Sequence, residues 1–227
     1  MIGIIGAMQE EIDGIKAVIE NKKTETISGV EFVRGTIGKR EVVVAKSGIG
    51  KVFAAICTQT MILKYNPEAI INVGVGGTLS DKLGIGDIAI ATGVVQHDMD
   101  TSPLGDPVGL LSGINIVEIP CSKKLVDAIG ECVEELSVKT RTGIIASGDQ
   151  FIGTPEQKKK IKENFNAIAC EMEGGSVGHV CYVNGVDFCV VRAISDSANG
   201  EASMDYPAFM KMAAENSIKV MKKFLAR

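Results

Sequence analysis

Two carboxylates stand close together in the stretch ACEMEGG, where Glu171 and Glu173 flank Met172 directly after an apolar run. A solvated strand end is the ordinary explanation of such a pair, because charged side chains are rarely buried. The alternative is that both carboxylates belong to a site. The choice depends on the other chemically capable residues and on the elements that carry them.

Glycine-rich turns follow several apolar segments, and small residues there let a ligand approach backbone N–H groups. GIIGAM follows the first apolar run, but its spacing differs from the dinucleotide pattern G-x-G-x-x-G. No acidic residue for a ribose closes a second strand about 20 positions later. KSGIGKV likewise lacks the phosphate-loop pattern G-x-x-x-x-G-K-S/T. These turns therefore argue against a nicotinamide, flavin or P-loop enzyme.

The thiols and imidazoles show no metal-binding spacing. The chain has only two histidines, His97 and His179, and six scattered cysteines without a CxxC pair. The cysteines are Cys57, Cys121, Cys132, Cys170, Cys181 and Cys189. We expect reduced thiols, no metal site and a reducing compartment, the cytoplasm.

Charge and length exclude several classes of protein. The 227 residues include 24 Lys plus Arg and 28 Asp plus Glu, for a net charge of -4 without a dense basic run. We therefore expect neither nucleic acid nor an anionic membrane as a partner. The start MIGIIGAMQEEI lacks the basic region of a signal peptide, and no apolar run approaches the ~20 residues of a membrane span. The length favours one domain over residues 1–227.

Apolar runs alternate with amphipathic segments along the chain, a pattern typical of parallel strands joined by helices. We predict an α/β fold, a three-layer α/β/α sandwich with a central mixed, twisted and partly barrel-like sheet. The predicted strands cover residues 2–5, 31–37, 41–46, 69–75, 86–95, 142–147, 167–172 and 188–196. The predicted helices cover about 9–20, 51–64, 123–136, 155–164 and 204–226. Residues 97–120 have little periodicity and are predicted to form one long irregular loop, of the kind that is often functional.

Six marked turns come at the carboxyl ends of the predicted strands. They are GAMQEE, SGIGK, GVGGT, SGDQFI, CEMEGG and RAISDS. In open α/β sheets, ligands bind outside the carboxyl ends of the strands. We therefore expect the six turns to face one crevice.

Taken in this order, the six stretches resemble the purine nucleoside phosphorylase and nucleosidase superfamily. Within it they are most similar to the bacterial 5'-methylthioadenosine/S-adenosylhomocysteine nucleosidases. The resemblance covers essentially the whole chain and is carried by IGIIGAMQEE, KSGIGKV, SGDQFI, EMEG and VVRAISD. It implies hydrolysis of the N-glycosidic bond of methylthioadenosine, S-adenosylhomocysteine and 5'-deoxyadenosine, which releases adenine and serves methionine salvage. It also implies a homodimer without metal or cofactor.

The resemblance assigns the catalytic roles to two acidic residues. Asp196 matches the family's acid, which protonates adenine N7 because the purine would otherwise leave as an anion. A free Asp titrates near pH 4, so this role requires burial or a neighbouring carboxylate. Glu11 matches the family's general base for the attacking water. The alternatives are a helix N-cap for Asp196 and a first-turn helix acid for Glu11.

Three further charged residues are expected beside the sugar. In a strand of period two, Glu171 and Glu173 point to the same face, towards the site. By resemblance, Glu173 accepts hydrogen bonds from the ribose 2'- and 3'-hydroxyls, and Glu171 is a supporting acid. Arg192 is expected to be a buried guanidinium near the acidic cluster, where it orients Glu11 or offsets its charge.

The resemblance also places residues around the base. Phe151 stacks on adenine, while the backbone of Ile152 contacts its N1 and N6 edge. Gly77 lies where the backbone approaches the purine. Met172 packs on the nucleoside, and Ser195 supports the ligand or Asp196.

An apolar slot for the 5'-alkylthio group is expected from three residues, Met8, Ile49 and Tyr206. The loop 97–113 matches a family segment that crosses the dimer interface and helps to cover the partner's 5' pocket. Leu104 stands where an aromatic residue is frequent in the family, and Val75 replaces a common Ser. These two departures affect the preference among 5' substituents more than the reaction.

Three other functions are compatible with parts of this pattern. One is a phosphate-dependent nucleoside phosphorylase, although GAMQEE offers a base where phosphorylases need anion-binding groups. A second is an aminodeoxyfutalosine hydrolase, which the same residues would serve. The third is a nucleoside-binding module without turnover, which would need neither Glu11 nor Asp196.

Overall fold

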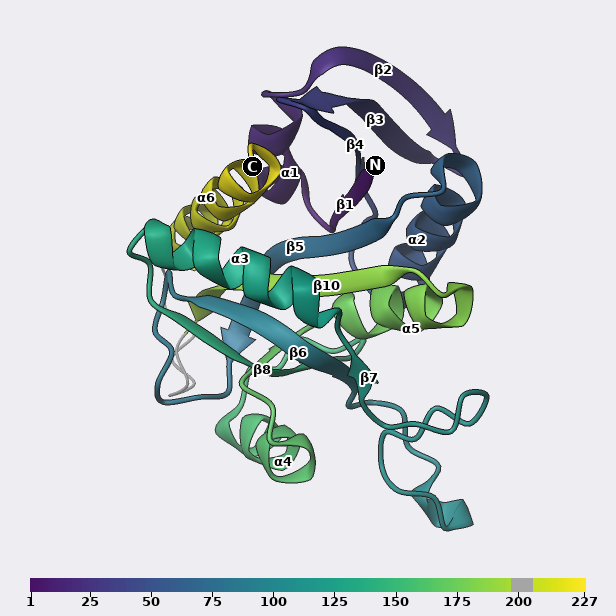
Figure 1. The fold of residues 1–227 in the computed structure, drawn as a ribbon. Coiled ribbons are helices and arrows are strands. Elements are labelled where there is room, and N and C mark those ends of the chain that lie inside the picture. The colour runs from purple at the N-terminus through teal and green to yellow at the C-terminus, as the bar shows by residue number, and fades with distance from the viewer. Residues whose placement is uncertain (197–205) are drawn as a thin grey trace.

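The computed structural model describes the backbone of residues 1–196 and 206–227, and the side chains of 1–196 and 209–227. A curved sheet occupies its centre and helices surround the sheet (Figure 1). The strands are β1 Ile2–Gly6, β2 Glu20–Ile27, β3 Val30–Ile37, β4 Arg40–Lys46, β5 Ala69–Thr78, β6 Ile88–Gln96, β7 Ile119–Pro120, β8 Thr140–Ser147, β9 Ala169–Glu171 and β10 Asp187–Asp196. The helices are α1 Gln9–Lys16, α2 Lys51–Tyr65, α3 Lys123–Glu135, α4 Pro155–Phe165, α5 Gly174–Asn184 and α6 Tyr206–Leu225.

The sheet is mixed, and part of it closes into a ring. The strand order is β10-β6-β8-β9-β5-β1-β4-β3-β2, and β10 also pairs with β5. The strands β10, β6, β8, β9 and β5 therefore form a closed circuit, from which β1 to β4 extend. This arrangement confirms the predicted mixed, partly barrel-like sheet.

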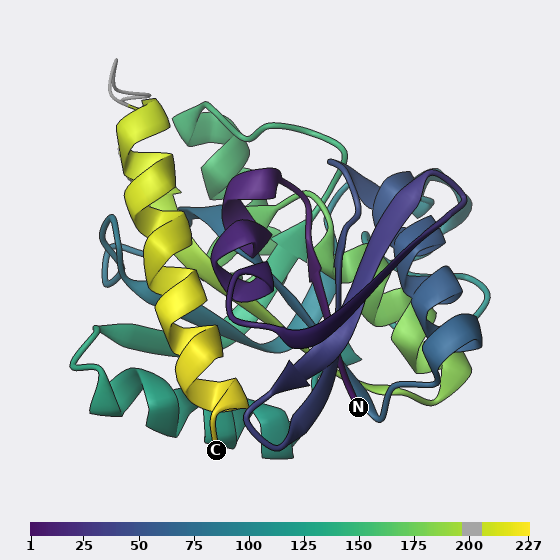
Figure 2. The same cartoon turned by 90° about the horizontal axis from the view of Figure 1, so that it is seen from above.

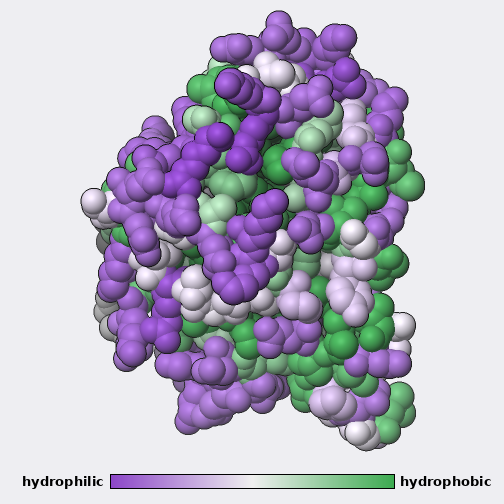
Figure 3. Space-filling model, in the orientation of Figure 1, coloured by the Kyte–Doolittle hydropathy of each residue, from purple (hydrophilic) through white to green (hydrophobic). Residues whose placement is uncertain are grey.

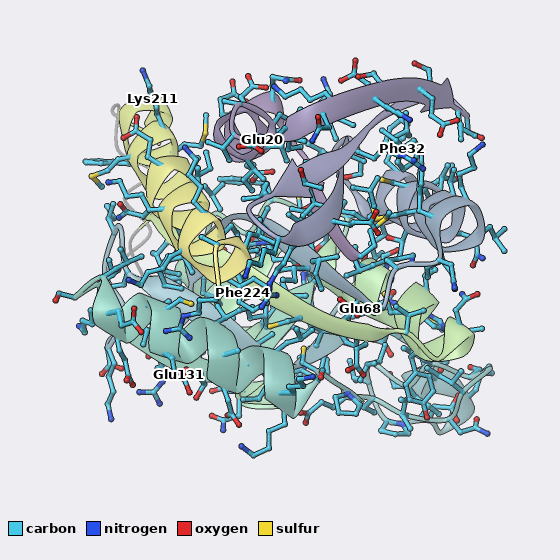
Figure 4. All side chains as sticks on the ribbon, turned by 45° about the horizontal axis from the view of Figure 1, so that its top comes forward. Glu20, Phe32, Glu68, Glu131, Lys211 and Phe224 are labelled. Atoms are coloured by element: carbon cyan, nitrogen blue, oxygen red, sulfur yellow. The ribbon has the colours of Figure 1, made fainter. Side chains whose placement is uncertain are left out.

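Helices pack on both faces of the sheet, as a three-layer arrangement requires. On one face, α1, α3 and α6 bury apolar side chains against the strands. Figure 2 shows α6 lying beside α1, and Figure 4 shows Glu131 on α3 and Phe224 on α6 on this same side. On the other face, α2 and α5 cover the sheet. A third, smaller cluster packs α4 against β8 and β9.

The N-terminal region departs from the prediction. The helix expected over 9–20 ends at Lys16, and an unpredicted strand, β2, begins at Glu20. This strand has no buried residue, so it lacks the apolar alternation that would mark a half-buried strand. Its charged side chains lie at the sheet edge, where they discourage pairing with other chains.

The segment between β6 and β7 is irregular, as predicted. It contains only a short 3₁₀ helix, Ser102–Leu104, and an isolated bridge between Leu111 and Ile116. None of the helices in the described ranges has the length and apolar character needed to cross a bilayer.

Candidate active site

One pocket opens at the carboxyl ends of the parallel strands, with about 710 Å³ of free space inside it and at its mouth. Each of the six marked turns contributes to its wall. The lining residues are Ala7, Met8, Glu11, Ile49, Val75, Gly76, Gly77, Gln150, Phe151, Ile152, Cys170, Glu171, Met172, Glu173, Ser195 and Asp196.

Glu11 enters the pocket from the first turn of α1, where it also caps the helix. Its Oε2 accepts hydrogen bonds from the N–H groups of Ala7 (2.7 Å) and Met8 (2.9 Å), and its Oε1 accepts one from Val75 (3.0 Å). Burial raises the pKa of this carboxyl above its ordinary value, although Arg192 and the three N–H groups act in the opposite direction. Glu11 is therefore both an acid in the first turn of a helix, as in the alternative interpretation, and a residue that lines the pocket.

A fully buried guanidinium lies behind the acidic wall. Arg192, 1% exposed, donates hydrogen bonds to the backbone and side-chain oxygens of Asn72 and to Glu171, and Nη2 is 3.6 Å from Glu173 Oε2. Burial lowers the pKa of Arg192, but Glu171, Glu173 and Glu11 together raise it above its usual value. The buried, paired arginine was expected. Arg192 itself is not among the residues that line the pocket.

Glu171 and Glu173 meet beside this arginine, but not for the reason predicted. Strand β9 ends at Glu171, and Glu173 is the N-cap residue of α5, so alternation along one strand does not align them. Instead Glu171 accepts N–H groups from Glu173 (3.0 Å) and Gly174 (2.8 Å), while Glu173 accepts the N–H of Gly50 (2.9 Å). Burial and then the neighbouring Glu171 raise the pKa of Glu173 to about 7.

A β-bulge directs Asp196 into the pocket. Ile194 pairs with Gly76 and Asp196 with Gly77, so Ser195 is an additional residue that interrupts the alternation of β10. Asp196 is the last residue of β10, and the residues that would form a helix after it lie outside the described ranges. Its Oδ2 accepts a hydrogen bond from Lys158 Nζ at 2.9 Å. Of the two conditions named for the acid role, burial or a neighbouring carboxylate, the second is not seen at this oxygen, whose partner is an ammonium group.

Two glycines of β5 make room for the acids. A Cβ atom built on Gly74 would lie 2.5 Å from Glu11 Oε1, and one on Gly77 would lie 2.9 Å from Asp196 Oδ1. Both distances are shorter than real Cβ contacts. The stretch GVGGT, which forms the end of β5, therefore brings its backbone close to both carboxylates, which larger residues would prevent.

The other predicted residues divide into two groups. Seven line the pocket in addition to the acids: Met8, Ile49, Gly77, Phe151, Ile152, Met172 and Ser195. Phe151 is 62% exposed, so part of its ring faces solvent at the pocket. The side chain of Tyr206, at the start of α6, lies outside the described residues.

The histidines and cysteines take no part in this pocket wall, apart from Cys170. His179 lies on α5, with Nδ1 3.4 Å from Gln96 Nε2, and burial lowers its pKa. All six cysteines are free thiols. In the described part of the chain, no group of three or more His, Cys, Asp or Glu side chains could hold a metal ion.

The comparisons with known proteins agree with this geometry. The family model described as "Phosphorylase superfamily" matches residues 1–226. The chain belongs to this superfamily. It is 40% identical to a 5'-methylthioadenosine/S-adenosylhomocysteine nucleosidase of Staphylococcus aureus strain JH9 over 228 residues, which span both chains completely.

Solved structures of other superfamily members have the same fold. A point mutant of the Helicobacter pylori nucleosidase, with 5'-methylthioadenosine in its active site, has a TM-score of 0.93 at 37% identity. It aligns with 98% of this chain and 96% of its own. A futalosine hydrolase of the same species has a TM-score of 0.93 at 38% identity, over 98% of this chain and 96% of its own.

Two residues of this superfamily member were missed in the sequence. Asn72 holds Arg192, and an Asn within the apolar run AIINVGV was the available signal. Lys158 donates a hydrogen bond to Asp196. Its spacing from Ile161 and Phe165 in the sequence could have indicated that it lies on the buried face of a helix. Lys158 shares the buried stripe of α4 with Ile161 and Phe165, so a lysine occupies a core position.

We predict that Arg192→Met destabilises the fold by about 3–5 kcal/mol, because it leaves buried carboxylates without their cation. Urea unfolding at pH 7 measures the change. The double variant Arg192→Met with Glu171→Gln should recover part of the loss, since it removes one of the stranded charges. A loss below about 1 kcal/mol in the single variant would show that the cluster does not need its arginine.

Glu173 should make stability depend on pH in a defined direction. Its pKa is raised from an ordinary 4.5 to about 7, so the folded protein binds a proton that the unfolded chain has already released. This contribution is complete below pH 4.5 and is lost as pH rises through about 7.

The free energy of unfolding of the wild type, relative to Glu173→Gln, should therefore fall between pH 5 and pH 8. The expected change is on the order of 1–3 kcal/mol. Denaturant titrations of both proteins at pH 5, 6, 7 and 8 measure it. A constant difference across this range would contradict the assignment.

Proposed function

We propose that this chain hydrolyses the N-glycosidic bond of 5'-methylthioadenosine and S-adenosylhomocysteine, and also of 5'-deoxyadenosine. The products are adenine and the corresponding ribose, and the reaction serves methionine salvage and the activated-methyl cycle. The observation that carries the proposal is that Glu11 and Asp196 line one pocket. The S. aureus relative, identical at 40% of positions, supports the choice of substrate.

The spacing of the two acids suits a nucleoside between them. Glu11 approaches β5 at Gly74 and Asp196 approaches it at Gly77, three residues further along the strand. A sugar ring and a water molecule must fit between an acid and a base of this kind. One acid can then act at the purine while the other acts on the opposite side of the ribose.

Proton transfer from Asp196 would make the purine a better leaving group. As the bond between C1' and the purine nitrogen breaks, its electron pair goes to the base. A proton on N7 neutralises the charge that would otherwise develop there. The bulge at Ser195 turns the carboxyl into the pocket for this role.

Glu11 would remove a proton from the attacking water. A carboxylate that is buried and has a raised pKa is a stronger base than one in solvent. The hydrogen bonds from Ala7, Met8 and Val75 fix its orientation. The water and the base would then be in place before the sugar becomes electron-poor.

Glu173 would accept hydrogen bonds from the ribose 2'- and 3'-hydroxyls. In its ionised form, the carboxylate would also stabilise positive charge that grows on the sugar in the transition state. Arg192 supports it from behind, with Nη2 at 3.6 Å. We assign Arg192 to positioning of the acidic wall.

The remaining pocket residues would select an adenine nucleoside with an apolar 5' group. Phe151 would stack on the base, the backbone of Ile152 would contact its N1 and N6 edge, and Gly77 would let the backbone approach it. Met172 would pack on the nucleoside. The alkylthio slot would be formed by Met8, Ile49 and Tyr206.

The charge of the pocket favours water over phosphate as the second substrate. No lysine, arginine or histidine is among its described lining residues, whereas Glu11, Glu171, Glu173 and Asp196 are. A phosphate dianion would meet carboxylates without a compensating cation. A phosphorylase of this superfamily would need the opposite arrangement.

Aminodeoxyfutalosine is the second candidate substrate. The H. pylori futalosine hydrolase matches this chain at 38% identity with a TM-score of 0.93, so the same fold and pocket could serve it. A substrate panel with identification of the products separates this activity from the first. The panel comprises methylthioadenosine, S-adenosylhomocysteine, 5'-deoxyadenosine and aminodeoxyfutalosine.

We further propose a cytoplasmic homodimer that forms across α2 and α5. Six free thiols suit a reducing compartment. Figure 3 shows hydrophobic side chains along the right-hand side of the molecule, over α2, α5 and the loop that follows β6. The exposed apolar residues of the two helices are Val52, Phe53, Ile56, Leu63, Tyr182 and Val183. Such a patch is typical of a protein interface.

The dimer would complete the pocket. Ile49 lines the pocket two residues before α2 begins, so a partner on α2 would lie near the 5' end of the nucleoside. Leu104, in the loop 97–113, is 84% exposed and would gain cover in the dimer. This is the segment that we propose approaches the partner's 5' pocket.

Pure protein incubated with methylthioadenosine in phosphate-free buffer should release adenine and free methylthioribose. Asp196→Asn should retain binding of a nucleoside analogue within about tenfold but lose at least about 100-fold in kcat, the range expected for loss of a general acid. Chromatography of the products and calorimetric titration measure both. A sugar 1-phosphate product, or near-normal activity of the variant, would contradict the mechanism.

Sedimentation should give twice the 24.0 kDa of one chain. Val52→Glu combined with Leu63→Glu should shift the protein towards monomer and raise the KM for methylthioadenosine. Val18→Glu, at an exposed apolar residue outside α2 and α5, is the matched control. A monomeric wild type would refute the proposed interface.

A further inference from the structure

A lysine is buried at the proposed acid, and the roles assigned above do not use it. The side chain of Lys158 is 7% exposed, and its Nζ lies 2.9 Å from Oδ2 of Asp196, whose side chain is 16% exposed. Removal of an ammonium group from water is costly, so lysine is almost never buried without a partner. The position of Lys158 therefore reflects its interaction with Asp196.

The local sequence holds Lys158 at this place. Thr154 caps α4 by accepting the N–H of Gln157, and Pro155 occupies the first turn of the helix. The helix thus begins shortly after the turn that carries Phe151. One face of α4 is buried through Ile161 and Phe165, and Lys158 continues that face towards the pocket.

The two oxygens of Asp196 differ in their contact with Lys158. Oδ2 accepts the hydrogen bond from its ammonium, and both oxygens lie beside Gly77 on the pocket wall, where a built Cβ atom would be 2.9 Å from Oδ1 and 3.2 Å from Oδ2. The neighbouring titratable group on β9 is the Cys170 thiol, whose pKa burial raises to about 12, so it remains neutral. Among the described residues, Lys158 is the only cation within ion-pair distance of Asp196.

We propose that Lys158 is a positioning residue for Asp196, and that it compensates the negative charge that remains on this carboxyl after it has protonated the leaving purine. The inference rests on the proposed nucleosidase function. The ammonium fixes Oδ2 and leaves Oδ1 for the purine.

The proton passes from solvent to Asp196 and from Asp196 to the purine. Asp196 first takes up a proton from solvent, with the nucleoside bound. The carboxyl O–H bond then breaks as an N–H bond forms on the purine, and the electron pair of the C1'–N bond goes to the purine. The oxygen of the attacking water forms the new bond to C1', and its proton goes to Glu11 and then to solvent. The carboxylate that remains is paired with the ammonium of Lys158, which keeps its three protons throughout.

Two effects of opposite sign follow. An ammonium beside the carboxyl makes it a stronger acid, which lowers the barrier to proton transfer. The same ammonium stabilises the ionised carboxylate relative to the protonated carboxyl. Without Lys158, the maximum of kcat should fall, while the alkaline limb of the pH profile should move to higher pH.

The test compares kcat and KM for methylthioadenosine from pH 5 to pH 10 in the wild type and in Lys158→Met. We expect the maximum of kcat to fall about tenfold or more, with KM changed less than about threefold. The alkaline limb should move up by about one pH unit, since each unit corresponds to a tenfold change in the proton equilibrium. Lys158→Arg, which keeps the charge, should retain the wild-type limb and restore most of the rate.

Lys159→Met is the matched control, because Lys159 is the next residue of α4 and its side chain is 76% exposed. It should behave as the wild type. If Lys158→Met does not fold, Lys158→Gln replaces it, with the melting temperature recorded for each variant.

The proposal is overturned if Lys158→Met keeps the wild-type maximum and limb. It is also overturned if the rate falls equally at every pH with the limb unmoved, since that result indicates a structural role. Failure of the proposed function is a separate result, in which the wild type itself releases no adenine.

Discussion

The electrostatic balance around one buried guanidinium is the interaction on which the site depends. Arg192 is enclosed by β5, β9 and β10, with Glu171, Glu173 and Glu11 around it and Asn72 beneath it. Three carboxylates brought together in a low-dielectric region repel one another strongly. The arginine offsets this repulsion, and in return the carboxylates compensate for the loss of its hydration. The acidic pocket wall and the arginine therefore require each other.

The backbone of β5 solves a second problem, that of space. Glu11 and Asp196 come from different ends of the chain, and each must approach the same strand closely. Gly74 and Gly77 remove the Cβ atoms that would block them. The strand also pairs with β9 and β10, which carry Glu171 and Asp196. Close packing on β5 thus sets the positions of groups that are distant in sequence.

The sequence predicted the layers, most strands and the convergence of six turns, because each depends on apolar periodicity and on the common position of strand ends. The prediction failed for features that depend on contacts between segments distant in the sequence. Strand β2 is polar throughout, so no apolar pattern marks it. Glu173 faces the pocket from the cap of α5, a position that depends on where β9 ends.

The surroundings of Asp196 could not be predicted from the sequence for the same reason. Nothing in RAISDS indicates a bulge, because the additional residue is defined only by pairing with Gly76 and Gly77. Lys158, 38 residues earlier in the chain, could be recognised as buried from its spacing with Ile161 and Phe165, but its partner could not. Resemblance to known nucleosidases supplied the roles proposed for the acids, whereas their environment could be seen only in the fold.

The bulge in β10 has a consequence for how this sequence can change over time. Because the count of residues between Arg192 and Asp196 decides which side chain faces the pocket, this stretch can exchange its amino acids more freely than it can gain or lose one. Deletion of a single residue would place a different side chain in the pocket at the position of Asp196. Related sequences should therefore keep the length of this strand even where its amino acids differ.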